Sequence, residues 1–113
     1  MSHVVQGPNS TAVIEGSNVT FTCVSNATSK IVWKFRRNAS DTAENIFTGL
    51  NIAQSHRLTP RLNVSSEFKG GLNSSNLIVA SVTLLDAGTY LCAEALSDID
   101  EYGELVVFGK QLS

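Results

Sequence analysis

Hydrophobic and polar residues alternate along much of this 113-residue chain, and turn residues separate the alternating runs. For example, single threonines separate Val19, Phe21 and Cys23. Successive side chains of a strand point to opposite faces, so such runs predict strands with one buried face. No helix-length window carries a sustained 3.6-residue apolar period. The expected strands lie near residues 4–5, 12–14, 18–23, 31–36, 44–47, 50–53, 61–65, 77–82, 90–93 and 105–108.

Two cysteines, Cys23 and Cys92, bracket the single tryptophan Trp33, and Tyr90 lies two positions before the second cysteine. This skeleton resembles the immunoglobulin superfamily, and the resemblance spans nearly the whole chain. It implies an all-β Greek-key sandwich of two antiparallel sheets, lettered A-B-E-D and G-F-C-C'-C''. It also implies an inter-sheet disulfide between Cys23 and Cys92, with Trp33 packed in the core.

The segment 41–60 is long enough for two extra strands between strands C and D, as in the nine-strand variable (V-set) type. Within that resemblance, Tyr90 would form the tyrosine corner, and Arg61 and Asp86 would form an ion pair at the bottom of the sandwich. Two departures separate the chain from antigen-receptor domains. Arg36 stands where such domains have a glutamine, and the stretch at residues 102–105 keeps only one of two expected glycines. The chain is therefore more similar to the outermost domains of adhesion and immune-type receptors.

The sequence also indicates an extracellular compartment. Sequons for N-glycosylation occur six times, against about two expected from the composition, at Asn9, Asn18, Asn26, Asn38, Asn63 and Asn73. A disulfide between Cys23 and Cys92 would also need an oxidising environment. The alternative is a cytosolic protein with two free buried thiols and accidental sequon matches.

Net charge is −2, so there is no electrostatic case for binding nucleic acid. The longest apolar runs have four residues and are too short to span a bilayer. We expect residues 1–3 to be an added start, residues 4–110 a V-type domain, and residues 111–113 a tail or linker. The whole is expected to be an ectodomain fragment of a membrane-anchored or secreted protein, attached to a membrane only through a segment outside this sequence.

No constellation of residues suggests catalysis, a cofactor or a metal site. The two histidines have no partner of catalytic spacing, and no cluster of cysteines and histidines has ligand spacing. Asp98, Asp100 and Glu101 alternate as acids do in a calcium loop, but the glycine and terminal glutamate of such a loop are missing. A solvated acidic turn is the preferred interpretation, and no enzyme activity is expected.

The sequons favour one sheet, because Asn18 and Asn63 are expected to point outward from strands B and D, while the body of strands C, F and G carries none. A glycan is bulky and blocks contact, so the C-F-G sheet is the expected partner-binding face. Leu91 is expected to point outward on it and, with neighbouring aliphatic residues, to form an exposed apolar patch. Scattered exposed aliphatic residues are also normal on a soluble domain. The expected face comprises Val32, Lys34, Arg36, Phe47, Leu91, Ala93, Asp98, Ile99, Asp100, Glu101 and Tyr102, with Phe47 and Tyr102 as aromatic anchors at its rim.

Basic residues of strand C and acidic residues before strand G share this face. They either balance each other within one molecule or form a two-fold interface between two copies. The expected function is protein recognition at the cell surface, homophilic or heterophilic. The alternative is a secreted innate-recognition domain that binds microbial or glycan surfaces through its loops.

Overall fold

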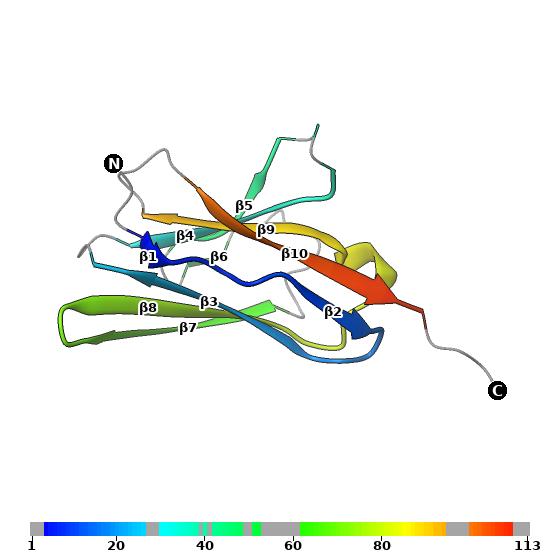
Figure 1. Cartoon of the computed structure of the whole chain (residues 1–113), viewed down its shortest axis with the longest axis horizontal. Helices are drawn as coiled ribbons and strands as arrows, with labels where there is room; N and C mark the ends of the chain where they lie inside the picture. Colours follow the sequence, from blue (N-terminus) through cyan, green and yellow to red (C-terminus); the bar gives the residue numbers. More distant parts are fainter. Residues whose placement is uncertain are drawn as a thin grey trace.

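The computed structural model describes residues 4–26, 30–38, 40, 42–48, 51–52, 62–94 and 100–109, and these residues form two facing β-sheets (Figure 1). One sheet has the strand order β1-β3-β8-β7, and the other has the order β2-β10-β9-β4-β5-β6. This confirms the expected all-β sandwich. The elements are β1 Val4–Gln6, β2 Thr11–Ile14, β3 Val19–Ser25, β4 Ile31–Arg36, β5 Glu44–Thr48, β6 Asn51–Ile52, β7 Leu62–Lys69, β8 Leu72–Val79, the 3-10 turn η2 Leu84–Asp86, β9 Gly88–Glu94 and β10 Glu101–Phe108.

The hydrophobic core lies between the two sheets and is built from the inward side chains of the alternating runs. On β3 and β4 every second residue is buried, as the alternation predicts. The Phe21 ring stacks on the Tyr90 ring, with centroids 4.9 Å apart. The Phe35 ring lies at the same centroid distance from Tyr90 and is tilted against it. These three rings come from β3, β9 and β4, so they join the two sheets through one aromatic cluster.

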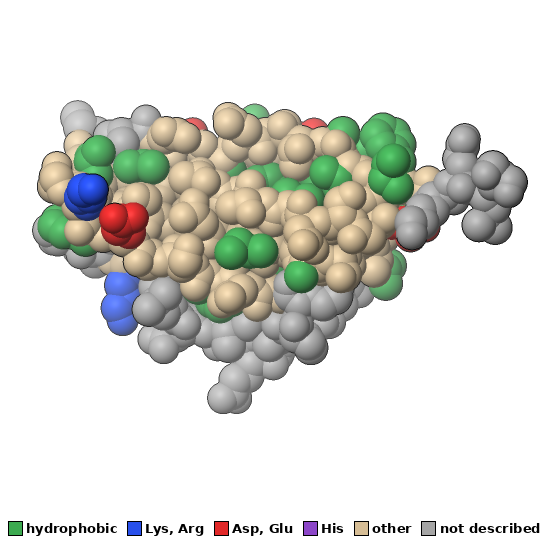
Figure 2. Space-filling model, turned by 90° about the horizontal axis from the view of Figure 1, so that it is seen from below, with side chains coloured by type: hydrophobic (Ala, Val, Ile, Leu, Met, Phe, Trp, Pro, Cys, Tyr) green, Lys and Arg blue, Asp and Glu red, His purple; other side chains and the backbone are tan. Residues whose placement is uncertain are grey.

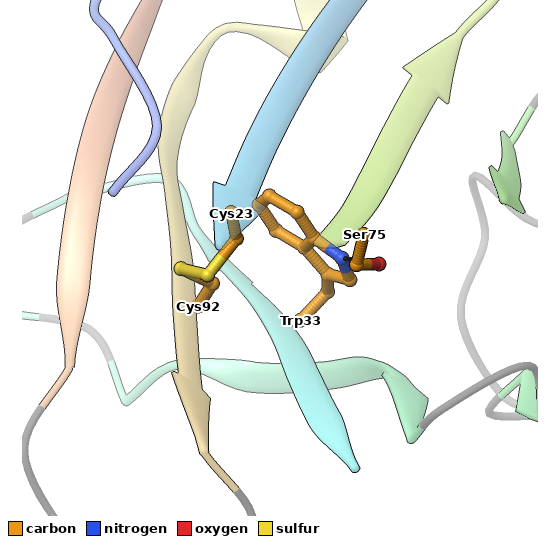
Figure 3. Close-up of a disulfide and its surroundings, with 4 residues drawn as sticks. All are labelled: Cys23, Trp33, Ser75 and Cys92. Carbon is orange, nitrogen blue, oxygen red and sulfur yellow. Dashed lines mark hydrogen bonds between the residues drawn. A yellow bond between two sulfur atoms is a disulfide. The ribbon is translucent and has the colours of Figure 1, made fainter. Parts of the chain in front are cut away.

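The disulfide confirms the expected link between the sheets. Cys23 on β3 and Cys92 on β9 are bonded, with their Cα atoms 6.5 Å apart (Figure 3). Trp33 lies beside the disulfide, and its indole Nε1 donates a hydrogen bond to the Ser75 hydroxyl on β8 at 2.9 Å. Because the indole N–H has a partner, the largest core side chain is buried without an unsatisfied donor.

The start of the chain departs from the expectation of two wholly antiparallel sheets. β1 pairs with β3, but β2 crosses to the other sheet and runs parallel to β10. The crossing follows Gly7-Pro8, and the chain there passes directly over Gly103. A Cβ atom on Gly103 would lie 2.9 Å from the carbonyl oxygen of Asn9. The glycine therefore permits a close backbone approach that alternation in the sequence does not reveal.

The turn before β9 is fixed by a compact set of hydrogen bonds. The Tyr90 hydroxyl donates to the backbone oxygen of Asp86 at 2.8 Å, which is the tyrosine corner that the resemblance implies. The Thr83 backbone N–H donates to the buried Asp86 carboxylate at 2.7 Å, and the Thr83 hydroxyl accepts from the N–H of Leu85 at 3.2 Å. The expected partner of Asp86, Arg61, lies outside the described residues.

Candidate partner-binding surface

The outward side of β4, β9 and β10, which we call the CFG face, is the surface that the sequence nominates. Cα partners on neighbouring strands point to the same side of a sheet. Lys34 on β4 is paired with Leu91 on β9, and Leu91 is paired with Tyr102 on β10. The register thus places these three residues in one row across the outward side of the sheet.

The prediction that Leu91 and Ala93 form an exposed apolar patch is wrong. Both point outward, yet Leu91 is only 4% exposed and Ala93 only 2%. The Lys34 ammonium and the Asp100 carboxylate form an ion pair at 3.1 Å; Lys34 lies on β4 and Asp100 directly precedes β10, and these two strands flank β9. The pair therefore crosses β9 on its outward side, and the aliphatic stem of Lys34 covers apolar surface there.

The prediction that Phe47 is an aromatic anchor at the rim is also wrong. Phe47 and its neighbour Ile46 are both buried in the core between the sheets. The register between β4 and β5 shifts at this point: Trp33 is paired with Phe47, but Lys34 is paired with Asn45. Ile46 is thus the extra residue of a bulge, which interrupts the alternation and turns Phe47 to the inward side that Trp33 occupies.

Tyr102 is an aromatic side chain that the CFG face offers to solvent, at 59% exposed, and Phe108, at the end of β10 on the same side, is 56% exposed. Glu101 beside it is exposed, and Val32 on β4 is half-buried. Lys34 and Asp100 are each 27% exposed and are paired within the molecule. This internal pairing accounts for those two charges without a second copy. The other predicted members of this surface, Asp98 and Ile99, lie outside the described residues.

Arg36 is the cation of the CFG face with an incomplete set of partners. It is half-buried, and its Nε atom is buried without a hydrogen-bond partner. The register places it in one row with Thr89 on β9 and Glu104 on β10. Leaving a buried donor unpaired costs roughly 1–3 kcal/mol, so a ligand that offers an acceptor here would recover part of that cost.

The outward side of β3, β8 and β7, which we call the BED face, has different chemistry. Thr22, Asn76 and Ser65 lie in one row across it, with hydrogen bonds of 2.7 Å from Thr22 to Asn76 and 3.4 Å from Asn76 to Ser65. Figure 2 views the molecule from the side of β7 and β8 and shows few charged side chains, with hydrophobic ones scattered over a mainly polar surface. The BED face is thus a mainly polar surface with hydrogen bonds between neighbouring strands, and its charged residues, Glu67 and Lys69, lie towards the end of β7.

The sequon asparagines are placed unequally. Asn18 and Asn63 are exposed at the BED face, and their amide oxygens accept hydrogen bonds from the backbone N–H of Ser81 and of Val64, both at 2.9 Å. These two bonds use the amide oxygen and do not involve the amide nitrogen, which is the atom that carries a glycan. Asn9, Asn26 and Asn38 are exposed in connections between strands.

Asn73 differs from the other sequon asparagines because it is half-buried on the β7–β8 hairpin. The hydroxyl residue of its sequon, Ser75, is 2% exposed and accepts the hydrogen bond from Trp33. The folded chain therefore presents this sequon less openly than it presents those at Asn18 and Asn63.

Within the described part of the chain, no group of three or more His, Cys, Asp or Glu residues could hold a metal ion. The same residues include no helix long and apolar enough to cross a membrane.

Two facing sheets, an inter-sheet disulfide packed against a buried tryptophan and a tyrosine corner define an immunoglobulin-type β-sandwich. The chain belongs to the immunoglobulin domain family, since the family model described as "Immunoglobulin domain" matches residues 3–94. A search of curated proteins gives no match to this sequence. The fold is one that typically serves as a recognition module and typically carries no catalytic site.

Proposed function

We propose that this chain is an extracellular V-set recognition module that binds a protein partner through the CFG face. The observation that carries the proposal is the asymmetry between the two outer faces. Sequons at Asn18 and Asn63 stand on the BED face, whereas β4, β9 and β10 contain no sequon. Since glycans obstruct protein contact, the face without them is the one available to a partner.

Three further observations support the proposal. β5 and β6 extend the sheet of β10, β9 and β4, and two such added strands characterise the variable type. The disulfide fits an oxidising extracellular environment. The six sequons fit passage through a glycosylating secretory pathway.

The proposed contact centres on Tyr102 and Arg36. Tyrosine and arginine are the residue types most often found at the energetic centre of protein interfaces. Tyr102 offers a large exposed ring, and Arg36 offers a partly desolvated guanidinium that suits a carboxylate. Leu91 supports this surface from beneath, since the pair of Lys34 and Asp100 covers it.

The proposal is tested by a binding screen against cell-surface ectodomains that includes this chain itself. We expect a protein ligand whose affinity falls about tenfold or more in Tyr102→Ala and in Arg36→Ala. The matched control is Thr22→Ala on the BED face, which should leave the affinity unchanged. Binding to glycans that is insensitive to Tyr102 and Arg36 would instead support the loop-based innate-recognition alternative and overturn the proposal.

A further inference from the structure

An exposed aromatic ring stands on the β7–β8 hairpin, at the end of the molecule opposite the C-terminal segment (Figure 1). Phe68 is 60% exposed, although it lies on the same side of β7 as the buried residues Leu62 and Val64. The turn of the hairpin extends beyond the ends of β4 and β9 in Figure 1, so these strands of the other sheet do not cover the ring. The fold thus leaves a phenylalanine open on the side of β7 that elsewhere faces the core.

The residue directly opposite Phe68 is a sequon asparagine. Phe68 and Asn73 are Cα partners across the hairpin, so their side chains lie on the same side of the sheet. The two-residue turn of Gly70 and Gly71, both with positive φ, is the kind that holds two strands in this register. The Cβ atoms of such partners are about 5 Å apart, so a sugar on Asn73 would lie within reach of the ring.

The neighbours of Asn73 leave a sugar one open side. Its Cα partner on β3 is Ser25, which is 0% exposed, and Asn73 itself is half-buried. On the β7 side, the Ser66 hydroxyl donates to the Asn73 amide oxygen at 3.5 Å, and this bond does not involve the amide nitrogen, which is the atom that carries a glycan. A glycan on Asn73 would therefore leave on the side of β7, where Phe68 is exposed.

We propose that the first N-acetylglucosamine of a glycan on Asn73 packs on the Phe68 ring and stabilises the hairpin. This rests on the extracellular location in the proposed function, because the glycan is attached in a glycosylating secretory pathway. Packing would remove apolar surface of the exposed ring from water. The face of an aromatic ring is also the negative end of its quadrupole, which suits the weakly positive C–H bonds on the flat side of a sugar.

The glycan must be attached before the hairpin packs on the core. The hydroxyl of the third sequon residue, Ser75, is 2% exposed and accepts a hydrogen bond from Trp33, so it is hidden in the folded chain. In the transfer, the Asn73 amide nitrogen bonds to the anomeric carbon of the sugar, and the bond from that carbon to a lipid-linked diphosphate breaks. The proton lost by the nitrogen leaves with the diphosphate. The sugar is then in place when the fold brings Phe68 opposite Asn73.

A double-mutant cycle of Phe68→Ser and Asn73→Gln, in chain secreted from glycosylating cells, tests the proposal. An endoglycosidase that trims each glycan to its first N-acetylglucosamine keeps the sugar that makes the contact. Phe68→Ser should lower the melting temperature by at least about 4 °C when Asn73 is glycosylated, and by clearly less in the Asn73→Gln background. The same cycle in chain refolded from bacteria, which add no such glycan, should show no coupling.

The matched control is Phe108→Ser, which removes a ring that is 56% exposed and has Ile14, not an asparagine, as its cross-strand partner. Its effect on the melting temperature should be the same with and without the sugar on Asn73. A Phe108→Ser effect that depends on that sugar would show that the coupling is not specific to Phe68 and would overturn the proposal.

Proton NMR of the trimmed glycoprotein gives a readout that does not depend on stability. The Phe68 ring current should shift protons of the Asn73-linked sugar upfield, and Phe68→Ser should abolish that shift. These protons are identified by their absence in Asn73→Gln. Sugar protons that do not respond to Phe68→Ser would overturn the proposal, as would an Asn73 that mass spectrometry shows to be unoccupied or a Phe68→Ser loss that is independent of the sugar.

None of these results touches the affinity of a protein partner for Tyr102 and Arg36. Failure here is therefore distinguishable from failure of the proposed function.

Discussion

The two outer faces of this sandwich are both built from alternating strands, but their outward side chains make different contacts. On the BED face, short uncharged side chains such as Thr22 and Asn76 satisfy one another by hydrogen bonds. On the CFG face, a longer ion-paired side chain, Lys34, lies over an apolar one, Leu91. In this sandwich the direction of a side chain therefore does not by itself decide its exposure, since Leu91 points outward and is 4% exposed. What decides it is the length and charge of its neighbours on adjacent strands.

The largest effect is predicted for removal of the disulfide that links the two sheets. Replacing both Cys23 and Cys92 with alanine should lower the free energy of unfolding by about 4 kcal/mol, since the disulfide closes a loop spanning most of the chain. Urea denaturation of the double variant measures this loss. A change below about 1 kcal/mol would show that the sheets hold together without the link.

The next effect compares the faces directly. Leu91→Ala should lower the free energy of unfolding by about 2 kcal/mol, because a large buried side chain is truncated beneath Lys34. Thr22→Ala, the matched change on the BED face, should cost about 1 kcal/mol or less. Urea denaturation of both variants gives the difference. Equal and small losses would mean that Leu91 is open to solvent and that the cover over β9 is not present.

A third prediction concerns the inward side of the same strand. Tyr90→Phe should cost about 1 kcal/mol, since it removes the hydroxyl that donates to the Asp86 carbonyl and keeps the ring stacked on Phe21. Thermal unfolding monitored by circular dichroism detects a loss of this size. Unchanged stability would indicate that water replaces the hydroxyl at the corner.

The smallest effect is expected for the ion pair that covers Leu91. Lys34 and Asp100 are partly exposed, so a double-mutant cycle with alanine at both positions should give a coupling of about 0.5 kcal/mol. Most of that coupling should vanish in about 1 M salt. A coupling that high salt leaves intact would show that the two groups interact in a more buried setting than their exposure indicates.

The sequence predicts the core strands of this fold well, because each of them has a local pattern in the sequence. Alternation marks β3 and β4, and the spacing around Cys23, Trp33 and Cys92 resembles a known sandwich. The crossing of β2 to a parallel pairing with β10 leaves only Gly7-Pro8 as a hint. It depends on a close backbone approach over Gly103, which has no local pattern.

The proposed partner-binding surface is harder to predict, because exposure on it depends on contacts between residues far apart in the sequence. Leu91 is correctly placed on the outward side, but the pair that covers it joins Lys34 to Asp100 across β9. The sequence predicts Phe47 at the exposed rim, but the bulge between β4 and β5 interrupts the alternation and turns its side chain into the core. Tyr102 lies on β10, which pairs with β9 without a bulge, and its side chain is exposed as the alternation of the sequence predicts.

We propose that a partner uses the CFG face because β4, β9 and β10 carry no sequon. The most direct test places a glycan there, with Tyr102→Asn combined with Glu104→Thr to create a sequon on β10 around the retained Gly103. The control is Tyr102→Asn alone, which removes the same ring without adding a glycan. We predict that the partner identified by the screen binds the control weakly and the glycosylated variant not at all. Equal binding to both, with the new glycan shown by mass spectrometry to be present, would contradict the claim.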